Sequence, residues 1–190
     1  MDPLFEAVPE CITTPRLILR SARAGDATAL NDAVVESFEA LHPYIPWAQT
    51  LPSPAQSEAD CRRMQARYLL REDLALFMFE RGADGGEGAF VGGTGLHRID
   101  WQVRRFEIGY WCRNSRVGNG FVTEAVQALT VFAFEQLQAR RLEVRMDDKN
   151  QPSWRVAERA GFTLEGVLRG ESLTPQGELR DMRVYARVSA

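Results

Sequence analysis

The stretch RVGNGFVTEAVQAL, residues 116–129, places two glycines directly before an apolar run with helical spacing. It follows RFEIGYWC, residues 105–112, whose aromatic and β-branched side chains predict a strand. The start of a helix leaves backbone N–H groups without partners, and glycines let the chain approach a ligand closely. This strand, turn and helix therefore predict an anion site that fits a pyrophosphate.

Other phosphate-binding motifs fit this turn poorly. It lacks the GxGxxG spacing of dinucleotide-binding folds and the GK[ST] ending of nucleoside triphosphate loops. Arg113 and Arg116 add positive charge beside the turn, in a chain whose formal net charge is -3. On spacing alone, a glycine-capped helix beside solvated arginines explains the pattern equally well.

The rest of the chain alternates between segments with strand and helix patterns. Strands are expected at residues 16–20, 74–80, 89–100, 105–112 and 141–146, and in a final hairpin of residues 162–173 and 178–188. Helices are expected at residues 24–38, at 57–71 with Ser57 as N-cap, around 122–133, and at 150–161. This order predicts an α/β fold with a mixed, mostly antiparallel sheet, not a doubly wound parallel one.

Composition indicates one globular domain over residues 1–190, with residues 1–12 as a mobile N-terminal tail. Of the 190 residues, 45% are hydrophobic and 26% are charged. The 23 basic and 26 acidic residues offer no broad electrostatic footprint for nucleic acid. Because no stretch reaches the roughly 18 apolar residues of a membrane span, and no signal peptide is visible, we expect a cytoplasmic protein without a membrane partner.

Cysteines and histidines indicate neither a disulfide framework nor a metal site. Cys11, Cys61 and Cys112 are odd in number and far apart, so we expect reduced thiols. His42 and His97 are too few and too distant in sequence to predict a metal centre. His97 could line a cleft, but a hydrogen-bonded structural role is the commoner fate of such a residue.

The ordered motifs resemble those of the GNAT superfamily of acetyl-CoA-dependent N-acyltransferases, whose signature at the glycine turn is [QR]xxGx[GA]. Gly120 matches its glycine, and Thr123 begins the frequent TEA, whereas Val117 and Val122 depart from the first and sixth positions. Arg116 could supply the missing first contact. TPRLILR resembles the family's opening strand, FEIGYW its acetyl-CoA strand, and NQPSWRVAERAGF its NxxSxxVxxxxGF helix. This set is most similar to the ribosomal-protein N-terminal acetyltransferase branch.

The resemblance implies a sheet whose fourth and fifth strands splay apart, so that the pantetheine arm of acetyl-CoA hydrogen-bonds between them. It also implies that the backbone of the fourth strand contacts pantetheine and that the amides of residues 118–122 contact the pyrophosphate. The implied acetyl-CoA-binding residues are Ile108, Gly109, Tyr110, Trp111, Arg113, Arg116, Val117, Gly118, Asn119, Gly120, Phe121, Val122, Thr123, Asn150 and Ser153.

For catalysis, the resemblance implies direct acetyl transfer with a base near the amine and an acid near the sulfur. Glu107 or Glu171 is the base, although Glu107 could instead pair with a neighbouring arginine and Glu171 could be a solvated carboxylate. Many family members use a tyrosine as acid where this chain has Ala157. Ser153 takes that role here, or else caps its helix. No partner residues around Cys112 indicate an acyl-cysteine route.

We expect an enzyme that acetylates a primary amine, in particular the N-terminal α-amine of a protein. The pKa of that amine is about 7.7 to 8.0, against about 10.4 for lysine, so a modest base suffices. The alternatives are acetylation of a small amine (an antibiotic, polyamine or amino acid) and a non-catalytic acyl-CoA sensor. The loop LHPYIPWA, residues 41–48, is a candidate lid over the acceptor. The strand MRVYARV, residues 182–188, offers an edge for a homodimer.

Overall fold

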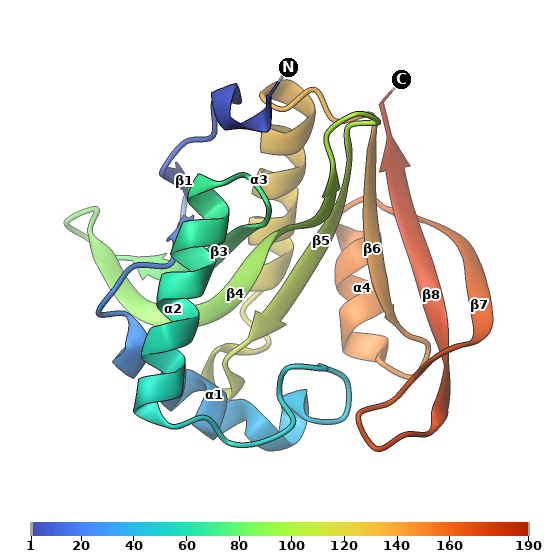
Figure 1. The fold of residues 1–190 in the computed structure, drawn as a ribbon, viewed down its shortest axis with the longest axis horizontal. Coiled ribbons are helices and arrows are strands. Elements are labelled where there is room, and N and C mark those ends of the chain that lie inside the picture. The colour runs from blue at the N-terminus through green and yellow to red at the C-terminus, as the bar shows by residue number, and fades with distance from the viewer. Residues whose placement is uncertain (1, 190) are drawn as a thin grey trace.

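The computed structural model describes residues 2–189, which form one eight-stranded sheet with helices on both faces (Figure 1). The strands lie in the order β1, β2, β3, β4, β5, β6, β8, β7. Their bounds are Cys11–Thr13, Leu17–Ser21, Leu74–Arg81, Glu87–Asp100, Arg105–Cys112, Arg141–Asp147, Thr163–Leu173 and Leu179–Val188 for β1 to β8. The mixed α/β fold predicted from the sequence is confirmed.

The two central strands β5 and β6 form the one parallel pair in this sheet, and they separate soon after they meet. Their register covers only Arg105–Glu107 against Arg141–Glu143, whereas β5 pairs with β4 as far as Cys112. Beyond Glu107 they diverge toward the bottom of Figure 1. They are the fourth and fifth strands expected from the sequence, because only the three-residue β1 was not foreseen. The predicted splay is confirmed.

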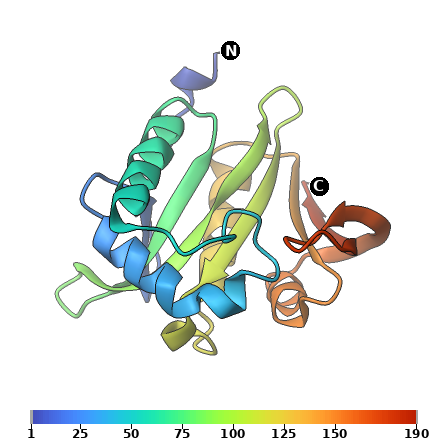
Figure 2. The same cartoon turned by 60° about the horizontal axis from the view of Figure 1, so that its bottom comes forward.

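Four α-helices cover the sheet. Their bounds are Ala27–Leu41, Pro54–Leu69, Phe121–Glu135 and Gln151–Arg159 for α1 to α4. Helices α1 and α2 lie on one face, and α3 and α4 lie on the other, as Figures 1 and 2 show from two directions. Because side chains alternate along a strand, Phe106 and Ile108 are buried on the α3 side, which leaves Glu107 on the α1–α2 side.

Helix α2 begins earlier than the sequence predicted. Ser53 is its N-cap: Ser53 Oγ accepts a hydrogen bond from the backbone N–H of Gln56, and the Gln56 side chain accepts one from the N–H of Ser53. Pro54 follows at the first helical position, where its missing N–H costs nothing. The expected cap, Ser57, is buried and its hydroxyl accepts a hydrogen bond from Asn31. The prediction of Ser57 as N-cap is therefore wrong.

The two ends of the chain also differ from expectation. Residues 182–188 do not form a free edge, because β8 lies between β6 and β7 and the sheet ends at β1 and β7. The structural reason given for a homodimer is therefore wrong, and dimerisation itself stays a prediction. The segment expected as a tail holds a 3-10 helix at Pro3–Phe5, and the Tyr68 hydroxyl donates to the carbonyl of Pro9. Its mobility likewise stays a prediction.

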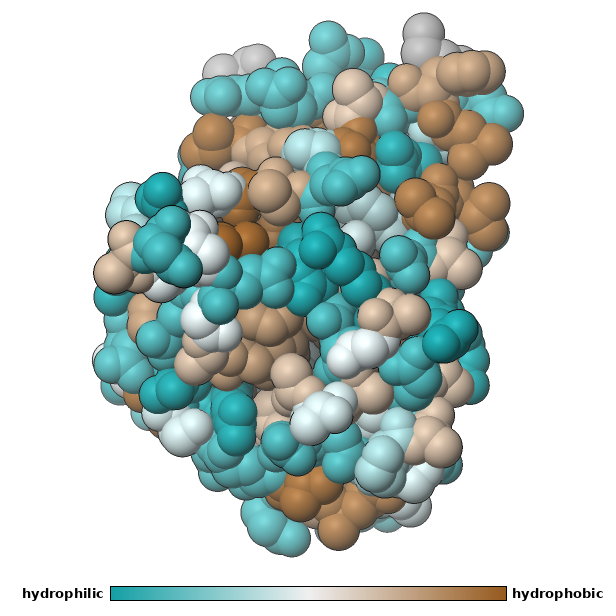
Figure 3. Space-filling view, turned by 90° about the vertical axis from the view of Figure 1, so that its left-hand side faces the viewer, coloured by the Kyte–Doolittle hydropathy of each residue, from teal (hydrophilic) through white to brown (hydrophobic). Residues whose placement is uncertain are grey.

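The surface around β1 carries both hydrophilic and apolar residues. Figure 3, which views the molecule from the left of Figure 1, shows apolar residues in separate patches among hydrophilic ones. A shallow hollow of about 610 Å³ lies between β1 and α3, with Ile12, Val131 and Phe132 among its lining residues. No helix within residues 2–189 combines the length and the apolar composition that crossing a membrane requires.

Candidate active site

The splay leaves the outer edge of β5 free where the sequence placed pantetheine. Ile108, Gly109, Tyr110 and Trp111 pair with β4 on one side only, within the described chain. Backbone N–H and C=O groups along such an edge can hydrogen-bond an extended ligand as they would another strand. The amide-containing arm of pantetheine has the chemistry that this edge requires, so these residues fit the predicted ligand.

The glycine turn opens the N-terminus of α3. Gly118 and Gly120 have φ angles of 82° and 77°, in the left-handed region that favours glycine. Gly120 is the N-cap residue, and no side chain caps the helix. Among the described residues, nothing accepts a hydrogen bond from the backbone N–H groups of Gly118 to Val122. These amides and the positive end of the helix dipole suit a diphosphate.

The two arginines predicted to hold phosphate already pair with carboxylates. Arg113 Nε lies 2.6 Å from Glu36 on α1, and Arg116 Nε lies 3.0 Å from Glu80 on β3. The second pair is a close ion pair without hydrogen-bond geometry. Sequence analysis missed Arg16, which donates to the carbonyl of Asn119 at 3.0 Å and lies 4.9 Å from the centre of the Phe121 ring. Arg16 therefore brings a third cation to the turn.

Glu124 explains the TEA sequence in structural terms. Its carboxylate accepts hydrogen bonds from Thr14 Oγ1 at 2.6 Å, from the Arg16 N–H at 3.0 Å and from Arg16 Nε at 2.6 Å. Burial opposes the charge, but these hydrogen bonds outweigh it and lower the pKa of Glu124. Glu124 thus attaches the first turn of α3 to the segment before β2. Thr123, also predicted at this site, is half-buried in the same turn.

The N-terminus of α4 is closed by a side chain. Asn150 is its N-cap, and Asn150 Oδ1 accepts a hydrogen bond from the Ser153 N–H at 3.2 Å. Asn150, which the resemblance implied as an acetyl-CoA-binding residue, thus orders the first turn of α4. The Ser153 hydroxyl donates to the Tyr110 hydroxyl at 3.2 Å, and the Tyr110 hydroxyl donates to the Ser153 carbonyl at 2.8 Å. A serine and a tyrosine therefore meet at the gap between β5 and α4.

Tyr110 was predicted only through its backbone, but its side chain belongs to this site. Burial raises the pKa of Tyr110 to about 12, so the phenol keeps its proton at neutral pH. The position where many family members carry a tyrosine is Ala157, which is fully buried. The hydroxyl of Tyr110 reaches the same helix from the neighbouring strand. No signal along the chain links the two residues, because 43 positions separate Tyr110 from Ser153.

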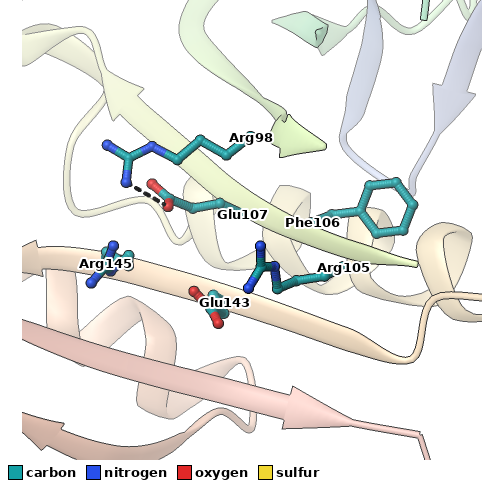
Figure 4. Close-up of a pocket in the computed structure, with 6 residues that line it drawn as sticks. All are labelled: Arg98, Arg105, Phe106, Glu107, Glu143 and Arg145. Atoms are coloured by element: carbon teal, nitrogen blue, oxygen red, sulfur yellow. Dashed lines mark ion pairs between the residues drawn. The ribbon is translucent and has the colours of Figure 1, made fainter. Parts of the chain in front are cut away.

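Glu107 faces the α1–α2 side and lines a small charged pocket of about 120 Å³ (Figure 4). Its carboxylate lies 3.4 Å from Arg98 Nη1, and in Figure 4 these two side chains point toward each other. Glu143 and Arg145 line the pocket from β6. Burial raises the pKa of Glu107, although Arg98 and Arg145 act in the opposite direction. A raised pKa makes the carboxylate a stronger base.

Glu171 forms an ion pair with Arg145, which lines this pocket. It lies on β7 where the pairing with β8 shifts register, and its Oε1 is 3.3 Å from Arg145 Nη2. Arg145 Nε is buried and has no hydrogen-bond partner in the described chain. Arg145 thus pairs with Glu171 and lines the same pocket as Glu107, the other predicted base. Glu171 is exposed, whereas Glu107 is largely enclosed.

Three glycines form the floor beside Glu107. A Cβ atom at Gly93 would lie 2.5 Å from Trp111 Nε1, and one at Gly109 would lie 2.8 Å from His97 Cδ2. Gly95, too, lies under the imidazole. The rings of Trp111 and His97 therefore occupy the space above these glycines on the acceptor side. His97 Nδ1 is 3.0 Å from both oxygens of Asp73.

The candidate lid lies across this face. The loop after α1 passes between the α1–α2 pair and the β7–β8 hairpin (Figures 1 and 2). Trp47 packs edge-on against Trp111, with ring centres 5.8 Å apart. Gln176 hydrogen-bonds His42 Nε2 at 2.9 Å, and Arg180 donates to the carbonyl of Tyr44 at 3.1 Å. The lid is thus attached to the hairpin by two hydrogen bonds.

Cys112 does not have the environment of a reactive thiol. It ends β5, and burial raises the pKa of its thiol to about 11. A thiol with such a pKa is protonated at neutral pH and is a weak nucleophile. No group of three or more His, Cys, Asp or Glu side chains within residues 2–189 is arranged to hold a metal ion.

Comparison with known proteins shows which family this chain belongs to. Residues 16–163 match the acetyltransferase (GNAT) domain family. The ribosomal-protein-serine acetyltransferase of Escherichia coli is 32% identical over 141 residues, which cover 72% of this chain and 75% of the relative.

Two solved structures share the fold. The ribosomal L7/L12 alpha-N-protein acetyltransferase RimL in complex with coenzyme A has a TM-score of 0.83 and 24% identity, covering 94% of this chain and 98% of its own. The microcin C7 self-immunity acetyltransferase MccE in complex with acetyl-CoA and AMP has a TM-score of 0.85 and 22% identity, covering 96% and 98%. With the domain match and the geometry above, the chain belongs to the GNAT family and is an acetyl-CoA-dependent acetyltransferase.

Proposed function

We propose that this enzyme acetylates the N-terminal α-amine of a protein. The observation that carries the proposal is the pair of complementary groups beside β5. Glu107 and Glu143, which Arg98 and Arg141 pair with in this structure, supply carboxylates for an ammonium group. The guanidinium of Arg145 lines the same pocket and supplies donors for a carbonyl oxygen. An N-terminal residue presents an ammonium group and a carbonyl oxygen together, whereas a simple alkylamine presents only the ammonium group. The name of the Escherichia coli relative agrees with a ribosomal protein as acceptor.

In this proposal, the proton donor for the sulfur and the binding site for the amine lie on opposite faces of the sheet. Acetyl-CoA, when bound, supplies the acetyl group as a thioester. We propose that the amides of Gly118 to Val122 bind the pyrophosphate and that the free edge of β5 orients the pantetheine arm. Ser153, supported by Tyr110, supplies the proton that the departing sulfur takes up. The amine approaches from the opposite face, where Glu107 lies.

The roles of the two glutamates differ in this proposal. Glu107 lies at the start of the splay and is proposed to contact the amine directly. Glu171 is exposed and bonded to Arg145, so we propose that it positions that guanidinium and does not take the proton itself. The Glu171→Gln variant should then keep most of its kcat and raise the KM for the peptide.

A small amine is the second candidate acceptor, and the attached lid favours it. Hydrogen bonds from Gln176 and Arg180 hold the lid against the hairpin and narrow the acceptor side. A peptide would require the lid to move. A compact amine with a nearby carbonyl, such as an amino acid derivative, would not.

A mixed pool of acceptors separates the candidates. N-terminal peptides, polyamines and aminoglycosides are incubated together with the protein and acetyl-CoA, and mass spectrometry reports which masses increase by one acetyl group. The proposal expects the increase on peptides with a free α-amine. An increase only on small amines would overturn it, and no increase despite measured acetyl-CoA binding would favour a sensor.

A further inference from the structure

The imidazole of His97 lies beside the proposed acceptor site, and the proposed reaction assigns it no role. His97 is on β4, directly opposite Glu107 in the antiparallel register with β5. Residues opposite each other in such a pair project from the same face, so His97 shares the acceptor side with Glu107. Its side chain is 30% exposed.

Two glycines make room for this ring. A Cβ atom at Gly109 would lie 3.0 Å from His97 Nε2, and one at Gly95 would lie 3.0 Å from His97 Cε1. Both distances are shorter than ordinary contacts of a Cβ atom, so side chains at these positions would displace the imidazole. Gly109 lies on the free edge of β5. His97 Nε2 is therefore directly above the strand proposed to carry the thioester.

Asp73 fixes the orientation and the tautomer. Both of its oxygens lie 3.0 Å from His97 Nδ1, and a carboxylate can only accept a hydrogen bond. Nδ1 therefore carries a hydrogen, and the tautomer of the ring that is neutral has its lone pair at Nε2. Within the described chain, no donor occupies that lone pair. A histidine with one nitrogen held by a carboxylate and the other facing a cleft has the arrangement of a general base.

We propose that His97, oriented by Asp73, takes the proton from the attacking amine, and that Glu107 binds the amine as a cation. This assignment rests on the proposed amine acetylation. The bound ammonium ion first loses one proton to water, and the neutral amine that results has the lone pair needed for attack. As its nitrogen bonds to the acetyl carbon and the carbon–sulfur bond breaks, a second N–H proton passes to His97 Nε2. Ser153 protonates the sulfur from the other face. Exchange with water then restores both residues.

An imidazole suits this step better than a carboxylate. A general base is most effective when its pKa lies near the working pH, and imidazole is the side chain that ordinarily titrates between about pH 5 and 8. The charged groups facing His97 come from several elements. They are Asp73 before β3, Arg67 on α2, Arg98 on β4, Glu107 on β5, and Glu143 and Arg145 on β6.

The His97→Asn variant separates a base from a structural histidine. The asparagine amide can keep the hydrogen bond to Asp73 but has no lone pair at the position of Nε2. We expect kcat to fall about 100-fold, with KM values changed less than about 2-fold, and the acidic limb of the kcat/KM profile to disappear. Asp73→Asn should lower kcat about 10-fold. Asp60→Asn, at an exposed ion pair on α2, is the matched control.

The Glu107→Gln variant should give the opposite result. Its KM for the amine should rise, and the acidic limb of its kcat/KM profile should remain. If His97→Asn retains kcat within about 3-fold, or if Glu107→Gln alone removes the limb, the proposal is wrong. Nitrogen NMR gives a readout without turnover, and the chain has only two histidines to assign. We expect His97 protonated at Nδ1 at pH 8, and its Nε2 signal to shift when acetyl-CoA is added.

These measurements distinguish the two proposals. Wild-type protein that acetylates no amine, but shows the expected His97 tautomer and shift, contradicts the proposed function and not the geometry. Active wild-type protein with an equally active His97→Asn variant contradicts only the assignment of His97. An Nε2-protonated ring at pH 8 would overturn the orientation by Asp73.

Discussion

Helices α3 and α4 both begin beside β5, yet their N-termini are built in opposite ways. The first turn of α3 has glycine as N-cap and no side-chain cap, so its amides face outward. The first turn of α4 is closed by Asn150, and Pro152 occupies one of its first positions. An open N-terminus is a binding site for an anion, whereas a closed one holds a side chain at a fixed place. The first suits the pyrophosphate, and the second positions Ser153.

The largest expected effect comes from closing the open N-terminus. Gly120→Val places a branched side chain at a left-handed residue and shields the amides of α3. We expect affinity for acetyl-CoA to fall at least about 100-fold, which corresponds to about 2.7 kcal/mol, as measured by calorimetric titration. Gly25→Val is the matched control, because Gly25 has a φ of 97° but lies before α1. Equal losses in both variants would contradict the open N-terminus as the binding site.

Opening the closed N-terminus should have a smaller effect of a different kind. Asn150→Ala removes the cap of α4 and should lower the free energy of unfolding by about 1 kcal/mol. Because Ser153 then loses its fixed position, kcat should fall about 10-fold with little change in acetyl-CoA affinity. Asn150→Asp keeps the cap and should restore both values. A variant whose affinity falls as much as its kcat would show that Asn150 contacts the ligand instead.

The attachment of α3 through Glu124 should contribute about 1 kcal/mol to stability at neutral pH. In the Glu124→Gln variant, the charge that Thr14 and Arg16 stabilise is lost. Since the folded-state pKa of Glu124 is lowered, the advantage of the wild type is present above the unfolded value of 4.5 and disappears as the pH falls through the folded one. Chemical denaturation at pH 7 and pH 3 measures this. A difference that does not shrink between pH 7 and pH 3 would contradict it.

The smallest effect on stability concerns Glu107, and it has the opposite sign. Burial raises its folded-state pKa, so the ionised carboxylate opposes folding above that pKa. Glu107→Gln should therefore melt at a slightly higher temperature than the wild type at pH 8. The difference should shrink as the pH falls toward 4, where both states are protonated. A variant that melts lower at pH 8 would mean that the ion pair with Arg98 outweighs the burial.

Local pattern predicted the strand and the helix that carry the proposed acetyl-CoA site. The strand at residues 105–112 and the turn before α3 were found because strand alternation, glycine spacing and helix periodicity act over a few residues. The splay of β5 and β6 came from the family resemblance and not from spacing. Even local pattern has limits, since Ser57 was predicted as the cap of α2 and Ser53 takes that place. Ser57 is instead buried against α1, where its hydroxyl accepts a hydrogen bond from Asn31.

The pairing of side chains across the candidate site could not be predicted, because these contacts join positions that are distant in the sequence. His97 meets Asp73 across 24 positions, Tyr110 meets Ser153 across 43, and Arg16 meets Glu124 across 108. A single sequence contains no periodicity that links such pairs. The place of β8 inside the sheet was missed for a similar reason. A hairpin pattern predicts that β7 and β8 pair, but not which of them also pairs with β6.

In this account, α3 binds the pyrophosphate and α4 positions the proton donor. The most direct test compares acetyl-CoA binding and turnover in one variant, Ser153→Ala. Acetyl-CoA affinity is measured by calorimetric titration, and kcat with the best acceptor from the mixed pool. If α4 positions the proton donor and α3 binds the pyrophosphate, the dissociation constant should stay within about 2-fold while kcat falls at least about 10-fold. An unchanged kcat, or a dissociation constant that rises as much as kcat falls, would contradict this account.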